Sequence, residues 1–143
     1  MPPNQRLAAA DVPSWLSGAW TRDWIQQQGA RSSTLDVRYL QTAMLFGDVR
    51  IPKGRPRFQH AASFADLTDQ ELRLLAQQES FSVRAAMDGG IATWHHHVDF
   101  QPPDGTDDVG RLEPIAHSRM YEHALDVGTW SRGDHLRTEK GDF

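Results

Sequence analysis

The chain has 143 residues, a formal net charge of −4 at pH 7 and no cysteine. This length supports one domain with a hydrophobic core and not two domains of ordinary size. Lysine and arginine are scattered singly and form no basic stripe that could neutralise phosphates, so we predict no nucleic-acid partner. Without cysteine, a disulfide, a thiolate metal site and a cysteine nucleophile are all excluded.

No apolar run approaches the roughly 20 residues that a membrane-spanning helix needs. The N-terminus also lacks a charged segment followed by an apolar stretch. We therefore expect a soluble, cytoplasmic protein that does not interact with membranes. Residues 1–12 contain proline, alanine and asparagine without a sustained period and are expected to form a flexible arm. Residues 13–143 are expected to form a single domain.

Most of this domain has the pattern of β-strands, in which alternate side chains face opposite sides. An alternating, aromatic-rich run predicts a first strand, one face of which carries Trp20, Arg22, Trp24 and Gln26. The run 35–51, closed by Pro52, predicts a long second strand with Asp48 and Arg50 on one face. Gly47 within this run indicates a bulge, which would exchange the two faces beyond it.

One segment has the pattern of a helix. Thr68 and Glu71 have the spacing of a capping box, and Leu72, Leu75 and Ala76 form a short apolar stripe. A short helix inserted between strands is expected either to pack on the sheet or to serve as a lid.

Further strands follow the helix. Residues 81–87 and 91–101 predict a hairpin around the turn formed by residues 88–90. Residues 111–123 alternate again and place Leu112, Met120 and Glu122 on one face. The last residues predict a turn and one more short strand.

These patterns amount to five or six strands and one helix. The fold class predicted is mainly β, an antiparallel barrel or a strongly curled sheet with one short helix. A closed barrel of this kind needs about eight strands. The missing strands would come from a second chain or from a longer polypeptide, or the helix would cover the gap. Because exposed strand edges favour association, we expect a homodimer.

A resemblance rests on the segments GAWTRDWIQ, VRYLQTAMLFGDVRIPKGRP, LTDQELRLLAQQESF, TWHHHVDFQPP, DVGRL and MYEHALD, which cover most of Trp20 to Asp126. In this succession the chain resembles a group of poorly characterised bacterial proteins with lipocalin-like (calycin) barrels. The resemblance implies a β-barrel that holds a ligand, and it carries over no reaction and no catalytic residue. Members of that group extend further at the C-terminus, so the resemblance does not imply that the barrel closes within this chain.

The segment IATWHHHVDFQPP, residues 91–103, contains the main candidates for chemistry. In an extended strand one face carries Trp94, His96, Val98 and Phe100, and the other carries Thr93, His95, His97, Asp99 and Gln101. If the apolar face points inward, His96 is an imidazole among aromatic side chains. Such a group titrates near neutral pH and can act as a general acid or base.

The first hypothesis is a pocket on this face that holds a small, partly apolar organic ligand. Acid/base chemistry of the isomerase or lyase type would use the catalytic candidates His96, Glu122 and Asp48. The candidates for ligand binding are Arg22, Arg50, Trp20, Trp94, Phe100 and Met120. Among these, either arginine could bind a carboxylate or an enolate. As structural alternatives, Asp48 and Arg50 form an ordinary ion pair and His96 is a satisfied core histidine.

The alternative hypothesis places a metal site on the opposite face. His95, His97 and Asp99 have the spacing to project together, as the His-x-His pairs of cupin-type barrels do. The residues that could complete a set for zinc, iron or manganese are Glu113, His117 and His123. The carboxylate in a Gly-rich turn that normally follows a cupin pair is absent, so the main prediction is no metal and no cofactor.

A third hypothesis is a non-enzymatic carrier or interaction module, in which Trp20, Trp24 and Trp94 only form the core. The sequence contains no Gly-rich phosphate loop, serine nucleophile elbow or dinucleotide fingerprint. Kinase, Rossmann and α/β-hydrolase functions are therefore disfavoured.

Overall fold

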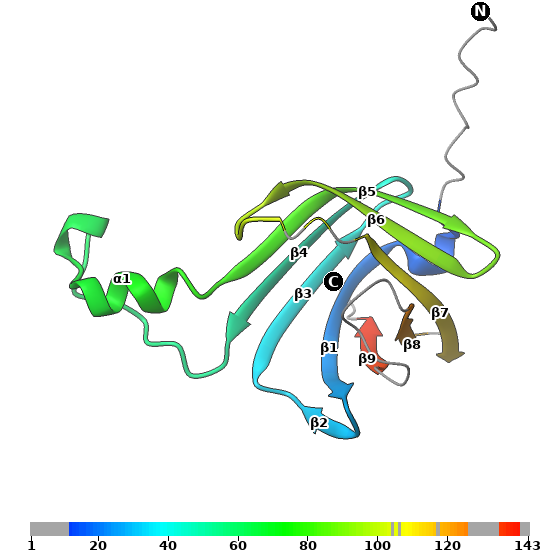
Figure 1. Cartoon of the computed structure of the whole chain (residues 1–143), viewed down its shortest axis with the longest axis horizontal. Coiled ribbons are helices and arrows are strands. Elements are labelled where there is room, and N and C mark those ends of the chain that lie inside the picture. The colour runs from blue at the N-terminus through cyan, green and yellow to red at the C-terminus, as the bar shows by residue number, and fades with distance from the viewer. Residues whose placement is uncertain (1–11, 104, 106, 117, 126–134, 141–143) are drawn as a thin grey trace, which may run out of the picture.

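The computed structural model describes residues 12–103, 105, 107–116, 118–125 and 135–140. These residues form one antiparallel sheet of nine strands in the order β2-β1-β3-β4-β5-β6-β7-β8-β9 (Figure 1). The strands are β1 Gly18–Gln27, β2 Ala30–Ser32, β3 Leu35–Gln41, β4 Leu45–Pro52, β5 Glu79–Asp88, β6 Ile91–Asp99, β7 Asp108–Ala116, β8 Arg119–Ala124 and β9 His135–Lys140. The helices are the 3-10 helices η1 Ser14–Leu16 and η2 Phe64–Asp66 and the α-helix α1 Asp69–Leu75.

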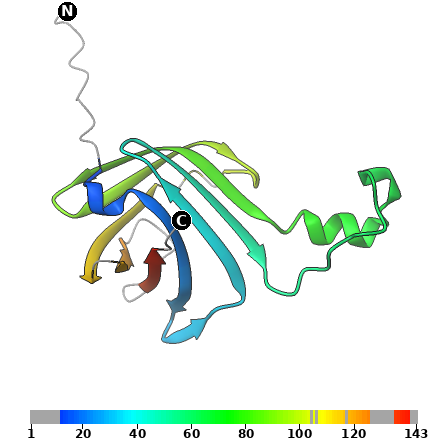
Figure 2. The same cartoon turned by 180° about the vertical axis from the view of Figure 1, so that it is seen from behind.

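The sheet is strongly curled, because β9 pairs both with β8 and with β1. In this last pairing Arg22 lies opposite Thr138 and Trp20 opposite Lys140. Figures 1 and 2 show the strands wrapping around a shared interior. The predicted class, a mainly antiparallel β fold with one short α-helix, is confirmed, and so is the short strand predicted near the C-terminus.

The strand count predicted from the sequence was too low, because two runs taken as single strands are hairpins and the short strand β2 was not predicted. Residues 35–51 fold into β3 and β4, and residues 111–123 belong to β7 and β8. The first turn contains neither glycine nor proline. Instead, the backbone nitrogen of Thr42 donates to the carbonyl of Leu45, and the Thr42 hydroxyl accepts from the Leu45 nitrogen at 3.0 Å. Threonine hydroxyls can stabilise turns in this way without the usual turn residues.

The prediction of a bulge at Gly47 is wrong. The β3–β4 pairing continues through Leu40 and Gly47 without a register shift, and Phe46 and Asp48 are both buried. Tyr39 lies directly opposite Asp48, so these two side chains enter the interior together. Asp48 and Arg50 therefore face inward along a regular strand.

Three register shifts lie elsewhere in the described sheet, and those in β6 and β1 exchange the faces of the strand. In β6, Val83 lies opposite His96 and Ser82 opposite Val98, so His97 is the extra residue. Beyond His97 the alternation is inverted, since two residues of one strand then oppose one of the other. Val98 and Phe100 are consequently 63% and 54% exposed, which overturns the predicted inward position of Phe100.

A second shift lies between Arg22 and Trp24 where β1 pairs with β9. As a result Trp24 does not follow Trp20 and Arg22 to the interior. The centroid of the Trp24 ring lies 6.1 Å from that of Tyr121, and the guanidinium carbon of Arg31 lies 4.1 Å from the Trp24 centroid. The prediction that Trp24 shares a face with Trp20 is therefore wrong.

The core gathers where η1 meets the curled sheet. Its buried members are Val12, Leu16, Trp20, Tyr39, Phe46, Ala85, Ala92, Trp94, Leu112 and Met120. Leu16 is completely buried, and its carbonyl accepts a hydrogen bond from Trp20 Nε1 at 2.7 Å. Val12, predicted to end a flexible arm, is buried and bonded to the carbonyl of Ala43, whereas the rest of the predicted arm lies outside the described residues.

The helix α1 has the predicted capping box. The Thr68 hydroxyl accepts from the Glu71 nitrogen at 3.2 Å, and the Glu71 carboxylate accepts from the Thr68 nitrogen at 2.8 Å. The expectation that the helix packs on the sheet or closes it as a lid is wrong. The segment 53–78 extends away from the strands, and no residue of α1 is buried (Figures 1 and 2).

No helix among the described residues is long and apolar enough to cross a membrane. The cytoplasmic location and the homodimer stay predictions. The strand shortfall that suggested a second chain does not exist, because β9 supplies the partner of β1 within the chain. The outer face nevertheless carries exposed apolar side chains, among them Leu40, Leu45 and Val98, which favour association.

Candidate functional site

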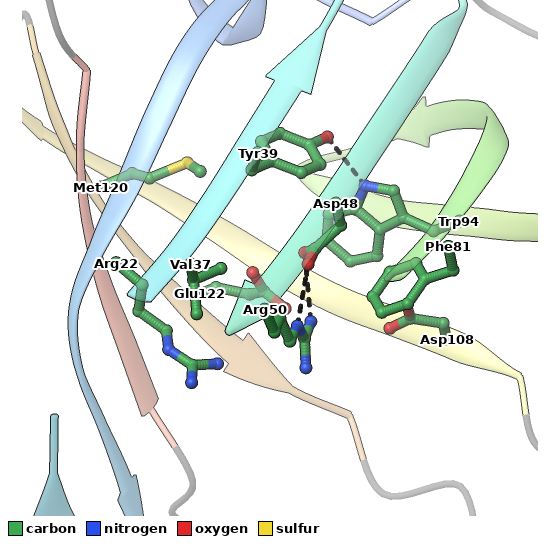
Figure 3. A pocket seen from close by; sticks show the side chains of 10 residues that line it. All are labelled: Arg22, Val37, Tyr39, Asp48, Arg50, Phe81, Trp94, Asp108, Met120 and Glu122. Atoms are coloured by element: carbon green, nitrogen blue, oxygen red, sulfur yellow. Dashed lines mark hydrogen bonds and ion pairs between the residues drawn. The ribbon is translucent and has the colours of Figure 1, made fainter. Parts of the chain in front are cut away.

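The inward side chains of the curled sheet surround a cavity, here named the inner chamber. Its lining residues are Arg22, Val37, Tyr39, Asp48, Arg50, Phe81, Trp94, Asp108, Met120 and Glu122 (Figure 3). Its own volume is small, about 40 Å³, and the space it opens into is much larger, about 630 Å³. Apolar side chains beside a few convergent polar groups are typical of small-molecule sites, and the chamber with the larger space outside it provides both.

The inner chamber continues into a wider outer cleft. Arg22, Arg50, Phe81, Trp94, Asp108 and Glu122 line both spaces. The outer cleft is further bordered by His96, Asp99 and the prolines that follow β6, Pro102 and Pro103. A molecule could therefore enter the chamber through the side where β6 passes into β7.

Asp48 and Arg50 form an ion pair inside the chamber. Arg50 Nε donates to Asp48 Oδ1 at 2.9 Å and Nη2 donates to Oδ2 at 3.2 Å, and the guanidinium lies 4.8 Å from the Phe81 ring centre. Burial opposes the charge of Arg50, but Asp48 outweighs it and raises the pKa of the guanidinium. The pairing satisfies both groups, so the structural alternative predicted for them is present and Asp48 is not a free base.

A chain of hydrogen bonds fixes the aromatic wall of the chamber. Trp94 Nε1 donates to the Tyr39 hydroxyl at 2.9 Å, this hydroxyl donates to the Gln41 side-chain oxygen, and Gln41 Nε2 donates to the carbonyl of Thr42 at 2.8 Å. Burial raises the pKa of Tyr39, which keeps its hydroxyl neutral. Both rings are thereby held in one orientation.

Glu122 reaches the chamber from β8. It is half-buried and borders the chamber. Its neighbours include Gly110 and Trp94, because a Cβ atom at residue 110 would lie 3.1 Å from Glu122 Cγ and 3.3 Å from the Trp94 ring. Burial, reinforced by Asp108 and Asp48, raises the pKa of Glu122 to about 8, against the opposing effect of the two arginines. Glu122 is thus mostly protonated at neutral pH.

Arg22 enters the chamber from β1 and is half-buried. Its guanidinium makes no hydrogen bond or ion pair with any of the described residues. Burial and the neighbouring charge of Arg50 lower the pKa of Arg22 to about 10, so it stays charged at neutral pH. Arg22 and Glu122 are the chamber's polar groups that lack a bonded partner in the described part of the chain.

His96 stands at the border of the outer cleft between two carboxylates. Its Nδ1 lies 2.8 Å from Asp99 Oδ1, its Nε2 lies 2.8 Å from Asp108 Oδ2, and its ring stacks on Phe81 with centroids 4.1 Å apart. The hydrogen bond to Asp108, opposed by burial and helped by Asp99, raises the pKa of His96. Both ring nitrogens of His96 are bonded to carboxylates. This geometry favours a structural role, in which a positively charged His96 links the end of β6 to the start of β7, over proton exchange with a ligand.

The structure brings most of the predicted site residues together. The chamber contains Arg22, Asp48, Arg50, Trp94, Met120 and Glu122, and the outer cleft contains His96. Trp20 is 1% exposed and belongs to the core, and Phe100 points outward, so neither lines the chamber. Sequence reasoning missed Val37, Tyr39, Phe81 and Asp108, and it named Asp99 only as a ligand of the alternative metal site. Asp108 lies opposite Trp94 only through the β6–β7 pairing, for which the sequence gives no signal.

The alternative metal ligands are not assembled. His95 and His97 are exposed, whereas Asp99 faces inward and bonds to His96. Glu113 is paired with His123 at 2.7 Å, and His117 lies outside the described residues. In the part of the chain that the structure describes, no group of three or more histidine, aspartate or glutamate side chains could hold a metal ion.

The sequence was also compared with known proteins. No model of a known protein family matches it, and a search of the curated proteins finds no similar sequence. The resemblance to lipocalin-like barrels accordingly stays a prediction, and the function has to be inferred from the geometry of the inner chamber.

Proposed function

We propose that the protein binds a small, partly apolar organic ligand in the outer cleft, with one end of the ligand in the inner chamber. Aromatic and aliphatic side chains form half of the chamber's wall and charged side chains form the other half (Figure 3). A lipocalin-like barrel, as the sequence resemblance implies, would be a container of this kind.

One observation carries the proposal. Arg22 and Glu122 border the chamber without a hydrogen-bond partner among the described residues. Buried polar groups in proteins are nearly always hydrogen-bonded, because leaving one unsatisfied costs about 1–3 kcal/mol. Groups left open toward a cavity are therefore available to a ligand or to water.

Binding of the neutral fluorescent probe N-phenyl-1-naphthylamine tests the proposal, since it depends on the apolar wall alone. Val37→Phe and Met120→Phe each fill part of the chamber and should weaken binding at least about tenfold. Val98→Phe adds the same ring on the outer face and is the matched control. Equal affinity of all four proteins would mean that the probe binds elsewhere and would contradict the proposal.

A second candidate function is acid/base catalysis of the isomerase or lyase type. It is favoured by a carboxyl group that lines the chamber and has a pKa of about 8, because such a group can donate and accept a proton near neutral pH. The geometry moves the central role from His96 to Glu122. Exchange of α-protons of keto acids for deuterium, followed by NMR, should be lost in Glu122→Gln and retained in His95→Ala; exchange that survives Glu122→Gln would exclude this role.

A further inference from the structure

We propose that the ligand is an organic acid with a single carboxylate, bound between Arg22 and Glu122 where the inner chamber opens into the outer cleft. This inference rests on the proposed ligand-binding function and names the chemical class of the ligand.

The first step concerns the two arginines. Arg50 uses Nε and Nη2 on Asp48, and its Nη1 lies 3.8 Å from Glu79, so its charge is already balanced by protein carboxylates. Arg22 has no such partner among the described residues, although it lies half-buried beside the same cavity. A guanidinium presents five N–H donors in a planar fork that matches a carboxylate. Arg22 is therefore the side chain of the chamber that can bind an anion.

The second step concerns Glu122, which lines both the chamber and the outer cleft together with Arg22. As a carboxylate it would repel an incoming anion. In its protonated form it carries one O–H donor, and a hydrogen bond between a carboxylic acid and a carboxylate is short and strong. Arg22 and protonated Glu122 can thus donate to the same carboxylate, and binding is coupled to the proton on Glu122.

The third step is the charge of the ligand. Asp48 neutralises Arg50, and a charged His96 offsets one of its two carboxylate partners, Asp99 and Asp108. Arg22 is the cation of this group that has no bonded carboxylate among the described residues. Asp48 and Asp108 also line the chamber and disfavour a second negative charge. A monocarboxylate fits this balance, and a phosphate or a dicarboxylate does not.

The apolar wall defines the rest of the molecule. Val37, Phe81 and Met120 line the chamber, and the ring of Trp94 is held by its bond to Tyr39 (Figure 3). A flat or branched hydrocarbon group would cover these side chains while the acid group reaches Arg22. The proposed class is therefore an aromatic or branched aliphatic monocarboxylic acid.

The experiment compares 1-naphthaleneacetate with 2-(1-naphthyl)ethanol, which share the same ring system and differ in the acid group. Affinities are measured by displacement of N-phenyl-1-naphthylamine, and 1-naphthylmethylphosphonate represents a ligand that can carry two charges. We expect the wild-type protein at pH 7 to bind the acid about 10–100-fold more tightly than the alcohol, as for a charge-assisted hydrogen bond. The phosphonate should bind more weakly than the acid.

The variants assign this preference to residues. Arg22→Gln should remove the preference for the acid, and Arg38→Gln should keep it, because Arg38 is exposed and bonded to Asp36. Raising the pH from 7 to 9 should weaken binding of the acid but not of the alcohol. Glu122→Gln, which retains a donor and cannot ionise, should remove this pH dependence. Thermal unfolding confirms that each variant is folded, and the wild-type comparisons need no variant.

The outcomes separate the two proposals. Equal binding of acid and alcohol, or a preference that survives in Arg22→Gln, would overturn the carboxylate inference and leave the ligand-binding chamber standing. If neither naphthyl compound nor the neutral probe binds, the proposed function fails, and the inference fails with it.

Discussion

Replacing Glu122 with glutamine should stabilise the protein at alkaline pH. The pKa of this carboxyl is raised from the ordinary 4.5 to about 8, mainly by burial. Because the pKa of Glu122 is higher in the folded than in the unfolded protein, its protonated form contributes stability to the fold. This contribution is fully present below about pH 4.5 and is lost as the pH rises through about 8. Glutamine keeps the shape and stays neutral, so the variant avoids this loss.

The magnitude follows from the same values. One pKa unit corresponds to about 1.4 kcal/mol, so the change from 4.5 to about 8 gives an upper value of about 5 kcal/mol. The chamber communicates with solvent through the outer cleft, which screens the charge, and we expect a difference on the order of 2–3 kcal/mol. For a chain of this size that corresponds to a rise in Tm of roughly 7–10 °C at pH 9.

Thermal unfolding followed by circular dichroism between pH 4.5 and pH 9 measures the effect. The two proteins should unfold at similar temperatures at pH 4.5 and diverge as the pH rises. Glu113→Gln, at an exposed position of β7, is the matched control and should show no such divergence above pH 7. A difference between wild type and Glu122→Gln that is independent of pH would refute the reasoning that Glu122 is protonated in the folded protein.

Three further predictions concern His96 at the outer cleft, the core residue Leu16 and the segment 53–78. His96→Ala leaves two carboxylates unpaired and should cost about 1–3 kcal/mol in urea unfolding, whereas exposed His95→Ala should cost less than about 0.5 kcal/mol; equal losses would contradict the bonded position of His96. Leu16→Ala, at a completely buried position, should lower the free energy of unfolding by about 2–5 kcal/mol, and a loss below about 1 kcal/mol would exclude its core role. Replacing residues 54–77 by a short Gly-Asn turn should leave the Tm within a few degrees, since α1 buries no residue, and a protein that no longer folds would show that this segment supports the sheet.

The sequence by itself determined the features that depend on local periodicity. Alternation of polar and apolar residues predicted a mainly antiparallel β fold, because strand side chains face opposite sides with a period of two. The same periodicity placed Asp48 and Arg50 together, and likewise Met120 and Glu122, and all four line the chamber. The capping box of α1 was also readable, since its residues are only three positions apart.

Only the tertiary structure decided which strands pair and where their faces change. The bulge at His97 exists because β6 has one residue more than β5 across that stretch, and it turns Asp99 inward and Phe100 outward. The pairing of β6 with β7 brings Asp108 to His96, and the pairing of β9 with β1 completes the curl. Strand pairing joins residues that are distant in the chain, so no local pattern can encode it. The chamber, unlike the strands that form it, is therefore a property of the folded sheet.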